Sequence, residues 1–204
     1  TIHGKFNFEK QEILSGSRIL KNKKTKNKID FFFENADDNY LVRNNILDKK
    51  DFLKKFQDYR KAWNEQPNEV VTEFKNNIKK KNYKLKNTIK PLCIDLELAS
   101  ICDLACPHCF REYLATPDKI MNLDFAEKII MDAIDNNVPS MKFNWRGEPL
   151  LNSSLGKLIK FAKDKGMLET IINTNATNLT KKKGMELIDS GLDYMIYSFD
   201  GGTK

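Results

Sequence analysis

The chain has 204 residues, of which 40% are hydrophobic and 31% are charged. This length and apolar content suffice for one packed domain with an appendage. No run approaches the ~18 uninterrupted apolar residues of a membrane span, and the N-terminus lacks the apolar centre of a signal peptide. The sequence therefore predicts a cytoplasmic protein that does not insert into a membrane.

Charge is distributed unevenly along the chain. Residues 1–90 hold 22 Lys and Arg against 12 Asp and Glu, a net of +10, whereas residues 91–204 have a net of −3. A basic region can attract an acidic protein, a polyanionic substrate or nucleic acid. Lysine and asparagine are abundant throughout this region, which is more typical of a solvated surface. Nucleic-acid binding is therefore the less favoured hypothesis.

Residues 1–90 predict a small α+β extension. Two apolar-aromatic runs, at 5–14 and 28–35, are typical of strands on either side of a lysine-rich turn. A stripe at helical spacing follows and should be buried: Phe52, Phe56, Tyr59 and Trp63. We expect that helix to end at Pro67. A weaker helical stripe follows it, from Val70 to Ile78.

Residues 91–204 alternate between strand and helix patterns. Strands are predicted at 92–98, 141–145, 169–174 and 194–199. The first helix between them should be capped by Asn122 and bury Phe125, Ile129, Ala133 and Ile134. The second should run from 155 to 165 and stop at Gly166, and a lysine-rich third should end near Gly191. Four strands joined by crossover helices predict a parallel sheet with right-handed connections.

Three of the four cysteines stand in one loop directly after the first predicted strand. Cys102, Cys106 and Cys109 follow the spacing C-x₃-C-x₂-C, which predicts metal ligands and not disulfides. A four-iron cluster needs four ligands, so three thiolates leave one iron open for chemistry. The alternative is a zinc site with His108 as fourth ligand. It is disfavoured because His108 directly precedes Cys109 and no separate second pair of ligands exists. Cys93 is predicted to be a small buried side chain.

This loop and three later motifs resemble the radical S-adenosylmethionine (SAM) enzymes. That superfamily has three cysteines in this spacing after its first barrel strand, and a Gly-Gly-Glu-Pro motif after its second. The second motif appears here as Arg146-Gly147-Glu148-Pro149. Thr174-Asn175-Ala176-Thr177 resembles the third-strand segment, and Ser198-Phe199-Asp200-Gly201 the fourth. All four motifs follow predicted strands, and the carboxyl edge of a parallel sheet is where ligands bind.

The resemblance implies a partial (β/α) barrel containing the first four of six strands. It implies a [4Fe–4S] cluster on the three cysteines, with SAM bound at the open iron. Residues assigned to SAM by the resemblance are His108 near the adenine, Arg146, Gly147 and Glu148 at the methionine, and Asn175 and Ser198 at the ribose and carboxylate. The implied reaction takes an electron from a reduced flavodoxin or ferredoxin, cleaves SAM, and abstracts hydrogen from a peptide, a sugar or another small molecule.

Tyr59-Arg-Lys-Ala-Trp63, together with the CPHC and RGEPLL segments, more narrowly resembles members that carry a C-terminal SPASM or related auxiliary-cluster domain. No such domain follows in this sequence. We therefore expect a piece of a longer protein, or a core too incomplete for independent activity. Two non-catalytic hypotheses stay open: a module with structural zinc or a structural cluster, and a basic nucleic-acid-binding protein.

Overall fold

The computed structural model describes residues 36–80, 90–114 and 117–199, together with the backbone of three short strands. These strands, β1 (Phe6–Asn7), β2 (Glu12–Ser15) and β3 (Arg18–Ile19), pair as an antiparallel sheet. The strand β3 lies in the stretch that was predicted as a turn, so that prediction is wrong there. The strand predicted at 28–35 lies outside the described residues.

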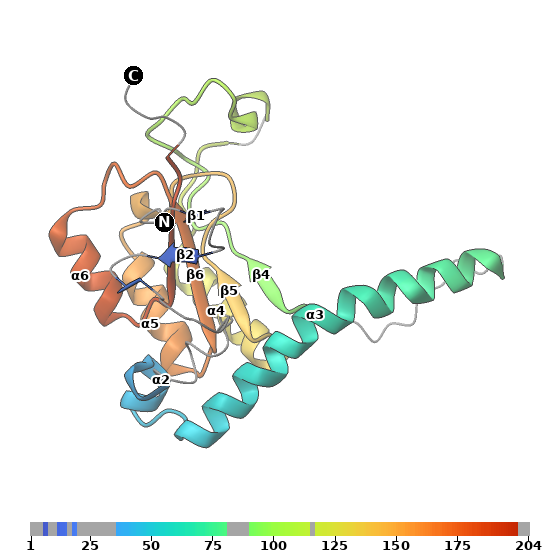
Figure 1. Cartoon of the computed structure of the whole chain (residues 1–204). Coiled ribbons are helices and arrows are strands. Elements are labelled where there is room, and N and C mark those ends of the chain that lie inside the picture. The colour runs from blue at the N-terminus through green and yellow to red at the C-terminus, as the bar shows by residue number, and fades with distance from the viewer. Residues whose placement is uncertain are drawn as a thin grey trace.

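Residues 36–80 are helical. A short 3₁₀ turn, η1 (Ala36–Asp38), precedes α2 (Tyr40–Arg43) and the long helix α3 (Lys49–Lys79). The prediction that this helix ends at Pro67 is wrong, because α3 continues through it. A proline removes one backbone hydrogen bond, but the residues on both sides keep a helical pattern, so the helix resumes. The far half of α3 projects away from the body of the protein (Figure 1).

Four parallel strands form the main sheet in the order β4 (Cys93–Asp95), β5 (Ser140–Lys142), β6 (Glu169–Thr174) and β7 (Tyr194–Tyr197). They are connected by α4 (Leu123–Asp135), α5 (Leu155–Asp164) and α6 (Lys181–Asp189), with 3₁₀ turns η2 (Phe110–Tyr113) and η3 (Pro149–Leu151) in the loops. The predicted α/β class and order of elements are confirmed. Gly166 and Gly191 take positive φ values of 92° and 86° after α5 and α6, a conformation that glycine adopts without strain.

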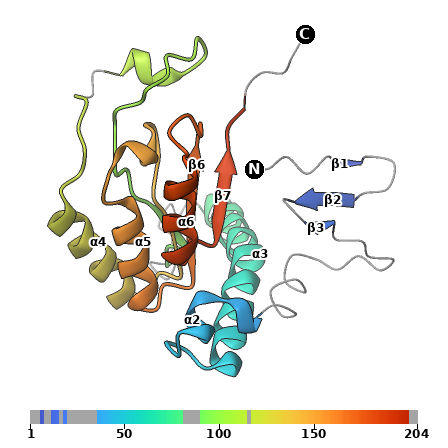
Figure 2. The same ribbon diagram turned by 90° about the vertical axis from the view of Figure 1, so that its left-hand side faces the viewer.

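The main core lies between the sheet and helices α4, α5 and α6, which cover one face (Figures 1 and 2). The buried face predicted for α4 is partly wrong, since Phe125 is 56% exposed. The helix instead buries Ala126, Ile130 and Ala133. Alanine at two of these positions allows a close approach to the sheet, and the bulky Phe125 remains outside. Among the described helices, none has the length and apolar character needed to cross a bilayer.

The opposite face of the sheet is unusually polar. Parallel sheets are normally apolar on both faces, but the side chains that alternate with the core residues here are mostly polar: Cys93, Asp95, Glu97, Ser140, Lys142, Asn144, Glu169 and Asn173. The helix α3 packs at the amino end of the sheet, where the hydroxyl of Tyr59 donates to Oε2 of Glu169 at 2.6 Å. A second core cluster, built by α2 and α3, includes Leu168.

Candidate functional site

The cysteine loop, residues 101–109, follows β4 and lies beyond the carboxyl edge of the sheet (Figure 1). The backbone N–H of Cys109 donates to the carbonyl of Cys106 at 2.9 Å, which closes a turn over Pro107 and His108. Cys102, Cys106 and Cys109 are half-buried, whereas the residues between them are exposed. The loop therefore keeps its three thiols partly sheltered and presents His108 to solvent.

These thiols suit an iron–sulfur cluster. All four cysteines of the chain are free, and burial raises the pKa of the Cys102 thiol, so thiolate formation there would depend on metal binding. Within the described part of the chain, no three His, Cys, Asp or Glu side chains converge closely enough to hold one metal ion. A cubane does not require such convergence, because each thiolate binds a different iron.

Gly147 brings the segment after β5 into direct contact with the start of the cysteine loop. A Cβ at this position would lie 2.1 Å from the carbonyl oxygen of Ala99 and 2.5 Å from that of Ile101. The neighbouring backbone N–H of Glu148 donates to the Ile101 carbonyl at 2.8 Å. Only glycine lets the backbone at position 147 come this close to the backbone of residues 99–101. The close contact places Glu148 beside the cysteine loop.

Glu148 is buried, and its carboxylate already accepts three hydrogen bonds. The donors are the backbone N–H of Leu150 at 2.9 Å, the hydroxyl of Thr174 at 2.7 Å and the backbone N–H of Asn175 at 2.8 Å. A carboxylate has about four acceptor positions, so one is left for a ligand. The sequence did not predict that Glu148 joins the ends of β5 and β6, and its contact with SAM stays a prediction.

Arg146 forms a bidentate ion pair with Glu97. Its Nε donates to Oε1 of Glu97 at 2.9 Å, its Nη2 contacts Oε2, and its backbone N–H donates to Oε1 at 3.0 Å. Burial raises the pKa of Glu97, but the hydrogen bonds and charge of Arg146 outweigh it and leave that pKa below its usual value. The guanidinium also lies 4.9 Å from the ring centre of Trp145. The Arg146 side chain therefore ties the segment after β5 to the one after β4.

Asn175 lies where the end of β6 meets the cysteine loop. Its Nδ2 is 2.8 Å from Oδ1 of Asp103 and 3.8 Å from Sγ of Cys102. Ser198 is exposed at the end of β7, and its backbone N–H donates to the Thr174 carbonyl at 2.9 Å. The structure thus joins Cys102, Glu148 and Asn175 in one network, with Ser198 next along the edge and His108 on the exposed turn.

Sequence analysis missed Asp103, which accepts hydrogen bonds from the side chains of Asn175, Thr177 and Asn178. Partial desolvation raises the pKa of Asp103, but these hydrogen bonds outweigh it, so its pKa lies below the usual value. Two signals could have identified it. An acidic residue directly follows the first cysteine, and every residue but one from 174 to 178 carries a polar side chain.

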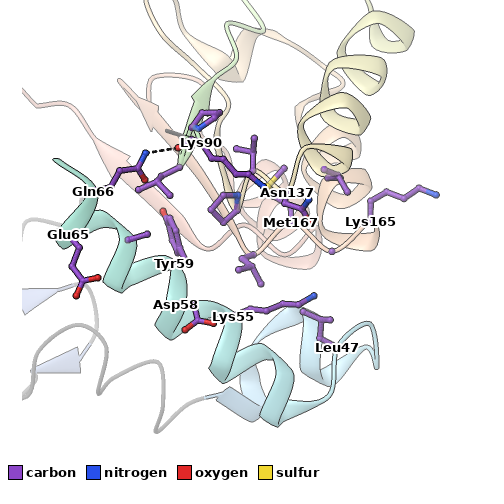
Figure 3. Close-up of a pocket in the computed structure, with 18 of the residues that line it drawn as sticks. Leu47, Lys55, Asp58, Tyr59, Glu65, Gln66, Lys90, Asn137, Lys165 and Met167 are labelled. Carbon is purple, nitrogen blue, oxygen red and sulfur yellow. Dashed lines mark hydrogen bonds between the residues drawn. The ribbon is translucent and has the colours of Figure 1, made fainter. Parts of the chain in front are cut away.

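Two cavities flank the sheet at opposite ends. A groove of ≈ 810 Å³ lies at the amino end between α3 and the loops before β5 and β6, with Tyr59 at its centre (Figure 3). Its floor is apolar, for example Leu92 and Met167, and its rim is charged. A smaller polar cavity of ≈ 180 Å³ adjoins the cysteine loop and is lined by Ser100, Arg111, Leu114, Asp118 and Arg146. Of these two cavities, only the smaller one contains a residue of the four motifs at the carboxyl edge, Arg146.

No family model matches the chain. Over 112 residues the chain is 33% identical to the PqqA peptide cyclase of Bradyrhizobium diazoefficiens, covering 54% of this chain and 29% of that protein. It is 32% identical over 108 residues to a tungsten-containing aldehyde ferredoxin oxidoreductase cofactor-modifying protein of Pyrococcus furiosus, covering 52% and 30%. A probable GTP 3′,8-cyclase of Methanococcus maripaludis is 32% identical over 106 residues, covering 52% and 35%.

These relatives indicate the radical SAM superfamily. The fold of the chain is also that of a solved structure, BtrN in complex with AdoMet and 2-DOIA, with a TM-score of 0.52 at 22% identity over 57% of this chain and 48% of that one. Radical SAM proteins use a [4Fe–4S] cluster and SAM. The chain spans only about a third of the length of the curated relatives described above, 29% to 35%.

Proposed function

We propose that this chain is part of a radical SAM enzyme that binds a [4Fe–4S] cluster through Cys102, Cys106 and Cys109, with SAM at the iron they leave open. The observation that carries the proposal is the hydrogen-bonded network at the carboxyl edge, in which Asn175 contacts both the Cys102 sulfur and the Glu148 carboxylate. When bound, the cluster supplies the electron that cleaves SAM and so generates the radical that removes hydrogen from the substrate.

The chain's own residues would hold the methionine part of SAM beside the cysteine loop. Glu148 has one acceptor position left for an ammonium group. Arg146 would contribute through its backbone, since its guanidinium is paired with Glu97, and Gly147 allows the close approach. Asn175 and Ser198 lie along the same edge for the ribose and carboxylate. His108 would face the adenine from the turn of the loop.

The substrate would lie against the polar face of the sheet. Among the residues that the structure describes, Oδ1 of Asn173 is buried without a hydrogen-bond partner, and buried polar atoms in proteins are normally paired. Lys142 and Asp95 form an ion pair on the same face, 3.8 Å apart. This supports a substrate rich in hydrogen-bonding groups, a peptide or a polar small molecule. A reduced flavodoxin or ferredoxin would supply the electron, and the cytoplasm would be the compartment.

Anaerobic reconstitution tests this function directly. Iron, sulfide and zinc are measured per chain, and the reduced protein is examined by EPR with and without SAM. We expect about four irons per chain and a spectrum that changes when SAM is added. Stoichiometric zinc without iron would overturn the proposal in favour of a non-catalytic metal module. Salt-dependent nucleic-acid affinity in a protein without iron would favour the nucleic-acid hypothesis instead.

Replacement of Cys106 by Ala tests the ligand assignment. We expect the variant to lose the cluster, because two thiolates from one loop cannot hold it. Cys93→Ala is the matched control, since this thiol is also half-buried but lies on β4, 3.6 Å from the Ser140 hydroxyl. The control should keep its iron. Full iron content in Cys106→Ala would contradict the assignment.

A further inference from the structure

One carboxylate fastens the cysteine loop to the segment after β6. Asp103 accepts hydrogen bonds from Nδ2 of Asn175 and Nδ2 of Asn178, each at 2.8 Å, and from the hydroxyl of Thr177. These donors are 72 to 75 residues away along the chain. Three donors on one carboxylate make this the main side-chain link between the two segments.

The link reaches the first cysteine through Asn175. The nitrogen of its side-chain amide lies between Asp103 and the Cys102 sulfur, at 2.8 Å and 3.8 Å. Its oxygen accepts from the backbone N–H of Thr177 at 3.0 Å. Since both ends of the amide are held, its N–H groups cannot turn away from the loop.

We propose that Asp103 is a positioning residue for the cluster. Its carboxylate holds the Cys102–Cys106 segment in place before the cluster binds and orients the Asn175 amide toward the Cys102 sulfur. This inference rests on the proposed function. A preset loop loses less conformational entropy when its thiols close on a cluster. Hydrogen bonds to cluster sulfurs stabilise their negative charge, and residues behind the ligands commonly strengthen metal binding.

Asp103→Asn tests the proposal. It keeps the size of the side chain but replaces one carboxylate oxygen by an NH₂ group, which then faces the amide donor of either Asn175 or Asn178. In the reconstituted protein, we expect an iron chelator to strip the cluster about five- to tenfold faster, the loss expected for one ordinary hydrogen bond. In the cluster-free protein, backbone amides of residues 102–106 should exchange with deuterium faster by a similar factor.

Two further variants make the result specific. Asp135→Asn, at an exposed aspartate on α4, removes the same charge far from the loop and should change neither rate. Asp103→Asn combined with Asn178→Asp places an acceptor opposite a donor again and should recover most of the cluster retention. If Asp103→Asn does not fold, Asn178→Ala removes a single donor and is expected to speed cluster loss about twofold.

The outcomes separate this inference from the proposed function. If the wild-type protein binds iron and Asp103→Asn shows the same rates of cluster stripping and deuterium exchange as wild type, the inference is overturned and the proposed function stays intact. A loss in the double variant as large as in the single one also overturns it, because restoring the donor–acceptor pair then has no effect on the cluster. Wild-type protein that takes up no iron overturns the proposed function, and the cluster role of Asp103 with it.

Discussion

Gly147 sets the distance between two segments of the site by lacking a side chain. The space that a Cβ would need is filled by backbone atoms of residues 99–101, which cannot rotate away as a side chain would. The consequence is a direct hydrogen bond from Glu148 to the start of the cysteine loop. In the motif Arg146-Gly147-Glu148-Pro149, the glycine is therefore required by the loop it packs against.

We predict that Gly147→Ala lowers the free energy of unfolding by about 3 kcal/mol or more, because the new Cβ overlaps carbonyl oxygens. Urea denaturation of the cluster-free protein measures this. Gly184→Ala on α6 is the matched control, since a Cβ there meets nothing closer than Leu179 at 4.0 Å. The control should gain up to about 1 kcal/mol, the helix propensity difference between glycine and alanine. Similar changes in the two variants would refute the steric argument.

The sequence predicted which residues gather at the carboxyl edge, but not what they contact. Glu148 and Asn175 follow successive strands, so topology alone places them together. Their partners depend on side-chain geometry between segments far apart in the chain. Glu148 bonds to Thr174 and Asn175, and Asp103 to residues more than seventy positions away. No spacing within a motif carries that information.

At the scale of elements, α3 is attached to the sheet by a buried hydrogen bond as well as by its apolar stripe. Burial raises the pKa of the Tyr59 hydroxyl, and the Glu169 carboxylate raises it further, so the phenol remains a donor at neutral pH. Glu169 is 3% exposed, and its other donor is the Ser140 hydroxyl at 3.1 Å. One bond therefore connects the middle of α3 to the first residue of β6.

Tyr59→Phe should lower the free energy of unfolding by about 1–3 kcal/mol, because it leaves a buried carboxylate with one donor fewer. Tyr113→Phe is the control, since Tyr113 is 81% exposed, and surface changes usually stay within about 0.5 kcal/mol. Thermal and urea unfolding at neutral pH measure both. Equal stability of Tyr59→Phe and wild-type protein would mean that the apolar stripe alone holds α3.

Element boundaries were predictable where a local signal sets them. Asn122 caps α4 by accepting from the backbone N–H of Phe125 at 3.2 Å. Gly166 follows the end of α5 with a positive φ. The end of α3 was not predictable from Pro67, because the cost of a proline is local and the residues on both sides keep a helical pattern. The buried face of α4 was also misplaced at Phe125. Packing against the sheet selects that face, and periodicity fixes it only to within one residue.

At the scale of the whole molecule, residues 36–80 share buried contacts with the α/β domain. The second core cluster contains Leu168 and has Leu92 packed against it. The hydroxyl of Tyr40 donates to Asp164 at 2.7 Å, and the side chain of Gln66 donates to the Lys90 carbonyl at 2.9 Å (Figure 3). The sequence predicted a boundary at residue 90 from the change of pattern. That boundary stays a prediction, since a change of pattern says nothing about how strongly two segments are coupled.

Two tryptophans allow this coupling to be measured. The chain has two, Trp63 on α3 and Trp145 in the segment after β5. The Trp145→Phe variant therefore keeps Trp63 as a fluorescent reporter of the helices, and the Trp63→Phe variant keeps Trp145 as a reporter of the sheet. Both rings are partly exposed, 42% and 59%, so neither substitution should cost much stability. We expect the fluorescence of each variant to change at the same urea concentration as its own circular dichroism, as in two-state unfolding. A Trp63 signal that changes at lower urea than the dichroism would show that residues 36–80 unfold separately, as a domain boundary at residue 90 requires.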